Sequence, residues 1–208
     1  MKHSITRFKS LAVALQELEP FIRNGEHLQT GRPFERLHGM RSREALANWL
    51  ICVAVNFEHG VDQLSFTSDP TGGDGLIYNS EMETTWKMEH VMVPRPHAAK
   101  AAEAADIEAL VLKAVARKVD KGGAAYASGK QLVVFINSGG SPWFPNSVAK
   151  RLPRPLHFDD VWVAALQYID GGEYTYCVTQ LDTTAGNAPV WQIRIAKDFD
   201  TWTVSRIQ

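Results

Sequence analysis

The sequence predicts an α/β protein with a mixed central β-sheet, and three observations lead to that fold class. The chain has 208 residues, a length that suits one domain. Apolar residues recur at helical spacing in some segments and at every second position in others. The order of these segments combines a meander of short strands with a helical crossover, which is typical of a mixed sheet. We therefore expect residues 1–208 to form a single α/β domain.

Two helices are expected before the first strand. Residues 4–23 carry apolar side chains at helical spacing. A second helix is expected to begin near Ser42, its candidate cap, and to end at Gly60. Its apolar face is expected to contain Leu46, Trp49, Leu50, Val53 and Phe57.

The apolar period then changes to two, which predicts strands. Short strands are expected at residues 63–68, 75–79 and 84–93, followed by an alanine-rich helix at 98–121 and a strand at 131–137. The unbroken apolar run of this last strand is typical of a strand covered on both faces. Asn146 is the candidate cap of a short helix, and three more strands are expected after it. The core thus spans about residues 41–137, with an extra N-terminal helix and a C-terminal strand extension at about 155–208.

Composition excludes several classes of protein. The chain is 45% hydrophobic and 22% charged, which is ordinary for a globular protein and unlike a disordered one. No apolar run approaches the roughly 20 residues of a membrane span, so we expect no membrane partner, and we expect no signal peptide. Two cysteines, Cys52 and Cys177, predict small buried side chains in a reduced, cytoplasmic protein. A net charge of −1 excludes a globally basic protein that coats nucleic acid, but allows local binding.

Charge is segregated along the chain. Residues 1–50 carry a net charge of +3, residues 51–94 of −6, residues 95–154 of +6 and residues 155–208 of −4. One interpretation is a cluster of carboxylates that holds a cation between basic flanks that face a polyanion. The alternative is that these blocks are only solvated faces.

Two acids of the negative block are expected to meet across a hairpin. Asp74 lies at the start of the second predicted strand, between glycines that allow a sharp turn. Glu89 lies midway along the third strand, whose alternation places His90 on the opposite face. A hairpin centred between residues 81 and 82 puts Asp74 opposite Glu89, at a Cβ separation of roughly 5 Å. Adjacent like charges destabilise a sheet unless something neutralises them, and Mg²⁺ favours such oxygen ligands.

This arrangement resembles a known superfamily. The αβββαβ order, the Asp and Glu on the second and third strands and the glycine-rich text DPTGGDGLI are similar to the PD-(D/E)XK nucleases, which have the restriction-endonuclease-like fold; this chain resembles a divergent member over about residues 41–137. The resemblance implies that Asp74, Glu89 and the backbone carbonyl of residue 90 bind Mg²⁺ or Mn²⁺. It also implies phosphodiester hydrolysis of nucleic acid, with a lysine that positions or activates the attacking water.

The family's lysine position holds Val91 in this chain, and two other lysines are candidates. Lys87 shares the strand face of Glu89. Lys118 falls in the middle of the apolar arc of the predicted helix at 98–121, where a charge is costly unless it meets a carboxylate. That arc is formed by Ile107, Val111, Ala114 and Val115.

Further basic residues are candidates for contact with a phosphate backbone. They are Lys113, Arg117, Lys121, Lys130, Lys150, Arg151 and Arg154. The segment SGGSPWF at residues 138–144 is a candidate for cradling an anion or stacking a base, or is a loop anchored by its aromatic residues. The alternatives to a nuclease are a non-catalytic module that binds nucleic acid or protein on the same core, and an unrelated α/β protein with a structural Glu–Lys pair. The apolar C-terminal strands could also form a homodimer.

Overall fold

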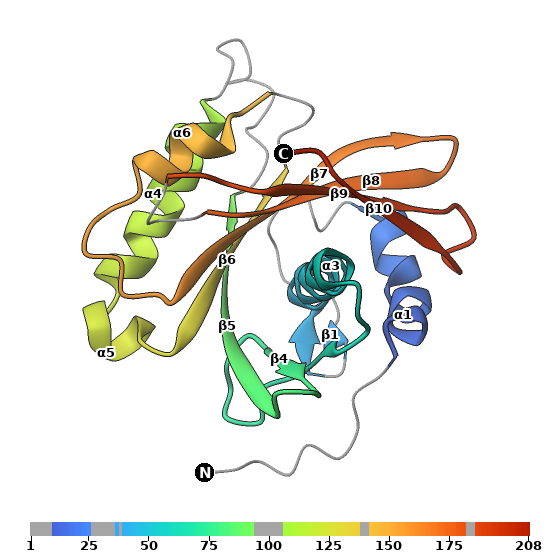
Figure 1. The fold of residues 1–208 in the computed structure, drawn as a ribbon, viewed down its shortest axis with the longest axis horizontal. Coiled ribbons are helices and arrows are strands. Elements are labelled where there is room, and N and C mark those ends of the chain that lie inside the picture. The colour runs from blue at the N-terminus through green and yellow to red at the C-terminus, as the bar shows by residue number, and fades with distance from the viewer. Residues whose placement is uncertain (1–9, 26–35, 38, 94–105, 138–141, 182–185) are drawn as a thin grey trace.

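The computed structural model shown in Figure 1 describes residues 10–25, 36–37, 39–93, 106–137, 142–181 and 186–208. Its helices are α1 (Leu11–Arg23), α3 (Ser42–His59), α4 (Ile107–Asp120), α5 (Gly123–Ala127) and α6 (Pro145–Lys150). Its strands are β1 (Arg36–Leu37), β2 (Met40–Arg41), β3 (Leu64–Thr67), β4 (Leu76–Asn79), β5 (Thr84–Val93), β6 (Lys130–Asn137), β7 (Asp160–Asp170), β8 (Glu173–Gln180), β9 (Val190–Ile195) and β10 (Trp202–Arg206). Among these residues no helix has the length and apolarity that a membrane crossing requires.

The expected mixed α/β sheet is present. Eight strands follow the order β10-β9-β8-β7-β6-β5-β4-β3, and β1 and β2 form a separate pair. Strands β5, β6 and β7 are parallel, whereas the other neighbours in the large sheet are antiparallel. The sheet curls around α3 with α1 beside it, and α4, α5 and α6 lie on the other side (Figure 1). Residues 131–137 of the central strand β6 are all buried, as expected for a strand covered on both faces.

Most of helix α3 is buried on all sides because the sheet curls around it. Every residue from 42 to 54 is buried, so the expectation of a single apolar face was too narrow. Phe57, which we placed on that face, is instead 46% exposed near the end of the helix. Trp49 Nε1 donates to the carbonyl of Leu11 at 2.8 Å and so ties α3 to the start of α1.

The helix boundaries correct several expectations. The N-cap of α3 is Arg41 and not Ser42, because Ser42 is already helical and Glu44 reaches back to accept from Arg41 N at 3.0 Å. The N-cap of α6 is Phe144 and not Asn146, with Pro145 in the first turn. Helix α4 begins at Ile107, and the expected part at 98–105 lies outside the described residues, as do residues 4–9 of the first helix.

Three strands and a helix were not expected from the sequence. They are β1, β2, β10 and the five-residue helix α5. Strand β10 extends the expected three C-terminal strands to a fourth, which pairs with β9. The two cysteines, Cys52 and Cys177, are buried and free, as expected.

Candidate functional site

The hairpin of β4 and β5 has the expected register. Leu76 pairs with Lys87 and Asn79 with Thr84, and Met88 N donates to the carbonyl of Gly75 at 2.9 Å. If this register is continued by two residues beyond Leu76 and Lys87, it puts Asp74 opposite Glu89.

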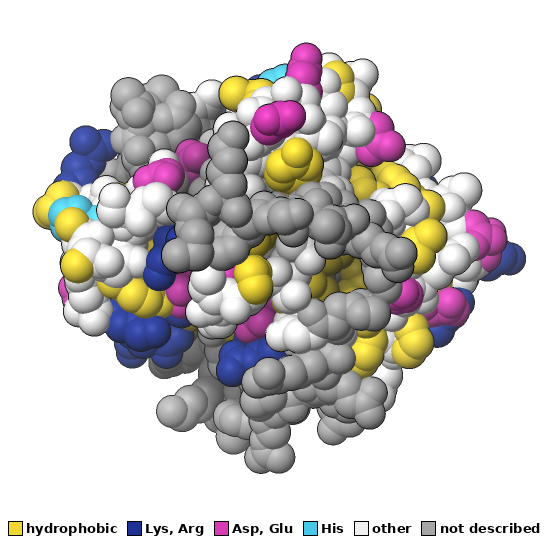
Figure 2. Space-filling view, turned by 90° about the horizontal axis from the view of Figure 1, so that it is seen from below, with side chains coloured by type: hydrophobic (Ala, Val, Ile, Leu, Met, Phe, Trp, Pro, Cys, Tyr) yellow, Lys and Arg dark blue, Asp and Glu magenta, His cyan; other side chains and the backbone are white. Residues whose placement is uncertain are grey.

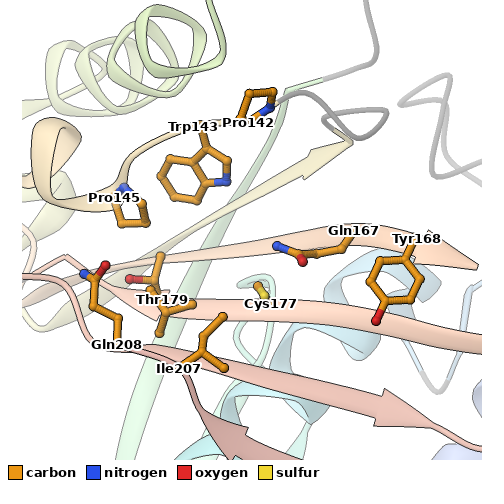
Figure 3. Close-up of a pocket in the computed structure, with 10 residues that line it drawn as sticks. Pro142, Trp143, Pro145, Gln167, Tyr168, Cys177, Thr179, Ile207 and Gln208 are labelled. Carbon is orange, nitrogen blue, oxygen red and sulfur yellow. The ribbon is translucent and has the colours of Figure 1, made fainter.

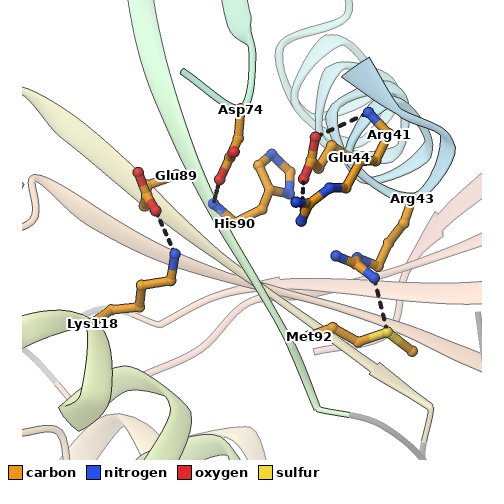
Figure 4. A network of polar contacts seen from close by, with 8 residues as sticks. All are labelled: Arg41, Arg43, Glu44, Asp74, Glu89, His90, Met92 and Lys118. Atoms are coloured by element: carbon orange, nitrogen blue, oxygen red, sulfur yellow. Dashed lines mark hydrogen bonds and ion pairs between the residues drawn. The ribbon is translucent and has the colours of Figure 1, made fainter. Parts of the chain in front are cut away.

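Asp74 lies where β4 separates from β5. Its Oδ2 accepts a hydrogen bond from His90 N at 2.7 Å, so the carboxylate satisfies an amide of β5 that β4 no longer reaches. Figure 4 shows Asp74 between Glu89 on one side and Glu44 on the other.

Gly75 allows this separation. Its φ of +145° is unfavourable for any residue with a Cβ, and a Cβ there would stand 2.4 Å from Asn48 Nδ2. The close approach of α3 and the turn of the chain therefore both require glycine next to Asp74.

Glu89 meets lysines on the α4 side of the sheet. It is 9% exposed, and its Oε1 accepts a hydrogen bond from Lys118 Nζ (Figure 4). Lys130 Nζ lies 3.9 Å from Oε2. The buried charge in this apolar strand is thus matched by two ammonium groups from other elements.

The helical spacing of α4 explains why Lys118 reaches Glu89. The buried residues of α4 are the four apolar residues expected from the sequence, Ile107, Val111, Ala114 and Val115. Lys118 continues this face by one more turn. Its side chain therefore passes over the sheet and ends at the carboxylate, with only 15% of its surface exposed.

Asp74, Glu89, Lys118 and Lys130 form a group of charged side chains that we call the carboxylate cluster. Tyr126 on α5 belongs to this cluster, and sequence reasoning did not identify it. Burial raises the pKa of its phenol. A hydrogen bond with Glu89 raises this pKa further, and so do the negative charges of Glu89 and Asp74. The ammonium groups of Lys130 and Lys121 lie 4.1 and 4.6 Å from its ring centroid. Lys121 Nζ also donates to the Tyr126 hydroxyl at 3.2 Å. The sequence signal that could have identified Tyr126 is an aromatic residue between two glycine turns, with a lysine before and after it.

Glu44 is a second missed residue, and it approaches Asp74 from the α3 side. It is 4% exposed, and Arg41 Nη1 lies 3.5 Å from its Oε1. Burial raises the pKa of Glu44, and the negative charge of Asp74 raises it further. Sequence reasoning considered only the apolar face of this helix, although the charged pair Arg43–Glu44 in its first turn was visible.

His90 is a core residue on the α3 side, opposite Glu89 as expected. Its Nε2 donates to Asn48 Oδ1 at 3.0 Å. Burial lowers the pKa of His90 to about 3, and the positive charge of Arg43 also lowers it. The imidazole is therefore neutral at physiological pH.

A basic groove adjoins the Glu89–Lys118 pair. Its volume is about 900 Å³, and it lies between the end of β5 and one side of α4. Four of its lining residues are cationic, and one is acidic: Lys113, Arg117, Lys118, Lys121 and Asp120. Lys118 thus belongs to both the groove and the carboxylate cluster.

The remaining predicted basic residues lie apart from this groove. Lys87 is exposed on β5, and its charge acts on Asp69. Burial raises the pKa of Asp69, but hydrogen bonds from Thr71 and the charge of Lys87 lower this pKa overall. Arg151 Nη1 lies 3.3 Å from Oε2 of Glu108 on α4, and Lys150 and Arg154 are exposed. Residues 138–141 of the SGGSPWF segment lie outside the described residues.

The donor set suits a hard divalent cation. Among the described residues no group of three or more His, Cys, Asp or Glu side chains could hold a metal ion. Mg²⁺, however, is usually held by one or two carboxylates together with water and substrate phosphate. Asp74, just before β4, and Glu89 in β5 are two carboxylates that could serve in this way, and oxygen ligands fit Mg²⁺ or Mn²⁺ better than zinc.

Comparisons of this chain with family models, with curated proteins and with solved structures find no match. Function is therefore inferred from the chemistry of the cluster.

Proposed function

We propose that the chain is a metal-dependent phosphodiesterase of the PD-(D/E)XK type that acts on nucleic acid. The observation that carries the proposal is the Asp74 carboxylate on His90 N, the residue that follows Glu89 in β5, together with the Lys118 ammonium on Glu89. Two acids and a lysine from three segments of the chain lie near the point where β4 leaves β5 (Figure 4), and ionisable groups gathered in this way are candidates for a catalytic site.

The order of elements supports the same proposal. Helix α3, strands β3, β4 and β5, helix α4 and strand β6 occur in the αβββαβ order of the superfamily, with the short helix α5 inserted between α4 and β6. The parallel pairing of β5 with β6 across the α4 crossover gives the sheet its mixed character.

Asp74 and Glu89 are the residues that would hold Mg²⁺ or Mn²⁺, with the carbonyl of His90 as a third oxygen. When bound, such a cation would lower the pKa of the attacking water and neutralise charge on the scissile phosphate. Lys118 and Lys130 place positive charge at the two carboxylate oxygens of Glu89.

Lys118 is the residue that would position the attacking water. Its ammonium donates three hydrogen bonds at most and is held at the edge of the basic groove. In the hydrolysis the water oxygen bonds to phosphorus, the phosphorus–oxygen ester bond breaks, and the proton released by water ends on the leaving oxygen. An ammonium beside the reacting phosphate also stabilises the charge that develops there.

The groove along α4 offers a path for the phosphate backbone. Lys113, Arg117 and Lys121 line it beside Lys118, and each phosphate contact adds affinity that salt weakens. Figure 2 shows Lys and Arg side chains interspersed with acids on the face in view, which favours local contact with a nucleic acid over coating.

Cleavage of single- and double-stranded DNA and RNA tests this proposal, with Mg²⁺ or Mn²⁺ titrated from zero. We expect Asp74→Asn and Glu89→Gln each to lose activity by at least about 100-fold. Asp74→Asn keeps an oxygen that accepts from His90 N, so it separates loss of charge from loss of the hydrogen bond. Glu81→Gln, in the exposed hairpin turn, is the matched control and should retain activity. Equal cleavage by the wild type and both site variants would refute the proposal.

A second candidate function is a non-catalytic module that binds nucleic acid. It is favoured by the two lysines that already neutralise Glu89, because a cluster balanced in this way does not need a cation. Anisotropy of labelled oligonucleotides in EDTA distinguishes the two functions. Binding in EDTA without cleavage at any Mg²⁺ or Mn²⁺ concentration would favour the module.

A further inference from the structure

A second pocket lies on the sheet face that carries α4 and α6, away from the carboxylate cluster. Its volume is about 560 Å³. It is bounded by the segment before α6, by strands β7, β8 and β9, and by the C-terminal residues (Figure 3). Trp143, Gln167, Tyr168, Thr179, Ile207 and Gln208 are among its lining residues.

The floor of the pocket holds a buried hydroxyl that has no partner in the part of the chain that the structure describes. Thr179 is 1% exposed, and its Oγ1 makes no hydrogen bond among the described residues. Buried hydroxyls are normally hydrogen-bonded, since leaving one unpaired costs about 1–3 kcal/mol. Because Thr179 lines the pocket, a bound molecule is a natural partner for this hydroxyl.

The side of the pocket across from Thr179 is apolar. Trp143 packs partly against the core on the α4 side of the sheet, and Figure 3 shows its indole across the pocket from Thr179. Pro142 and Pro145 flank it on the same side, and Ile207 stands on the other. The partly exposed indole of Trp143 offers a flat apolar face on which a ring can stack.

The polar groups of the pocket are uncharged. Its described lining contains hydroxyls and the carboxamides of Gln167 and Gln208, and no Asp, Glu, Lys or Arg. An ionised ligand would lose its hydration there without a counter-charge. A sugar would present hydroxyl groups around its whole edge, and the apolar walls would leave several of them unpaired.

We propose that this pocket binds a nucleobase, that is, a flat uncharged heteroaromatic ring that stacks on Trp143 and hydrogen-bonds Thr179. A base carries donors and acceptors on its edge and apolar faces above and below, which matches the pocket on both counts. This inference goes beyond the proposed hydrolysis and does not depend on the cation site. It gives a role to the aromatic part of the SGGSPWF segment, which the carboxylate cluster leaves unused.

Equilibrium binding of adenosine, guanosine, cytidine and uridine tests the proposal, followed by tryptophan fluorescence and by NMR chemical shifts. We expect Trp143→Leu to weaken binding by about fivefold or more, because one stacking wall is lost. Thr179→Val has nearly the same shape, and we expect it to change the preference among the four bases. Phe144→Leu is the matched control, since Phe144 is 69% exposed and lies outside the described lining. Unfolding of each variant by circular dichroism confirms that it is folded.

The outcomes separate the nucleobase from other ligands. The proposal is wrong if none of the four nucleosides binds at millimolar concentration. It is also wrong if indole and methyl glucoside bind as tightly as the nucleosides. Tighter binding of a short single-stranded oligonucleotide than of its nucleoside identifies a strand as the source of the base, and equal binding identifies a free nucleoside. Asp74→Asn should bind nucleosides like the wild type, so failure here is distinct from failure of the hydrolase proposal.

Discussion

Replacing Lys118 with methionine tests how strongly Glu89 depends on its partner. Methionine keeps most of the apolar stem of the lysine and removes the ammonium that donates to Glu89 Oε1. The carboxylate, with 11% of its side chain exposed, would keep Lys130 at 3.9 Å as its partner among the described ion pairs.

The magnitude follows from the burial of this pair. Two unit charges about 4 Å apart attract by about 4 kcal/mol at an effective dielectric constant of about 20. Removing one partner of a buried pair typically costs about 3–5 kcal/mol. Because both side chains keep some exposure and Lys130 remains, we expect Lys118→Met to lower the free energy of unfolding by about 3 kcal/mol.

Urea unfolding at pH 7 measures this change in a double-mutant cycle. Lys118→Met combined with Glu89→Leu should recover most of the loss, since an apolar pair of similar size replaces the ion pair. Lys113→Met, on the same helix but exposed, should change the stability by less than about 0.5 kcal/mol. If Lys118→Met is as stable as Lys113→Met, the ion pair does not balance Glu89 and our account of the cluster is wrong.

Three further predictions concern other parts of the site. Gly75→Ala should destabilise the protein by about 2 kcal/mol more than Gly72→Ala in urea unfolding. Both glycines have positive φ, but only at Gly75 would a Cβ collide with its surroundings. Equal losses of stability would contradict this. Because the pKa of His90 falls from 6.5 to about 3 on folding, the unfolded chain binds a proton between these pH values that the folded chain does not. Stability is therefore lost as pH falls through that window, and His90→Gln should reduce the slope by up to about 1.4 kcal/mol per pH unit; an unchanged slope would show that His90 does not titrate in this way. Replacing Lys113 and Arg117 together with glutamine should weaken oligonucleotide binding and reduce the slope of log affinity against log salt by about 2, and an unchanged slope would place the nucleic acid elsewhere.

Local patterns predicted much of the cluster. The turn between β4 and β5 fixes the register, so the pairing of Leu76 with Lys87, two residues from Asp74 and Glu89, followed from counting residues from the turn. Lys118 could be found because a charge in the middle of an apolar helical arc needs a buried partner. Both inferences use periodicity within one or two neighbouring elements.

The parts that sequence reasoning missed depend on contacts between distant elements. Glu44 comes to Asp74 because the sheet curls around α3, and nothing in the residues of α3 specifies that curl. Tyr126 and Lys130 reach Glu89 through α5 and the parallel pairing of β5 with β6. Pairing of strands that are far apart in the chain depends on packing across the whole sheet.

Short elements were missed for a different reason. Strands β1 and β2 have two residues each, too few to show a period of two. Strand β10 follows a turn in which Phe199 has a positive φ of 58°, a conformation that a bulky residue rarely adopts and that sequence patterns do not indicate.

Binding of Mn²⁺, followed by electron paramagnetic resonance and calorimetry, tests the central claim most directly. That claim is that Asp74 and Glu89 share one divalent cation. We expect the wild type and Glu81→Gln to bind one Mn²⁺ that Mg²⁺ displaces, and Asp74→Asn and Glu89→Gln each to lose it. Mn²⁺ binding that is absent from the wild type, or that survives in both site variants, would contradict the claim.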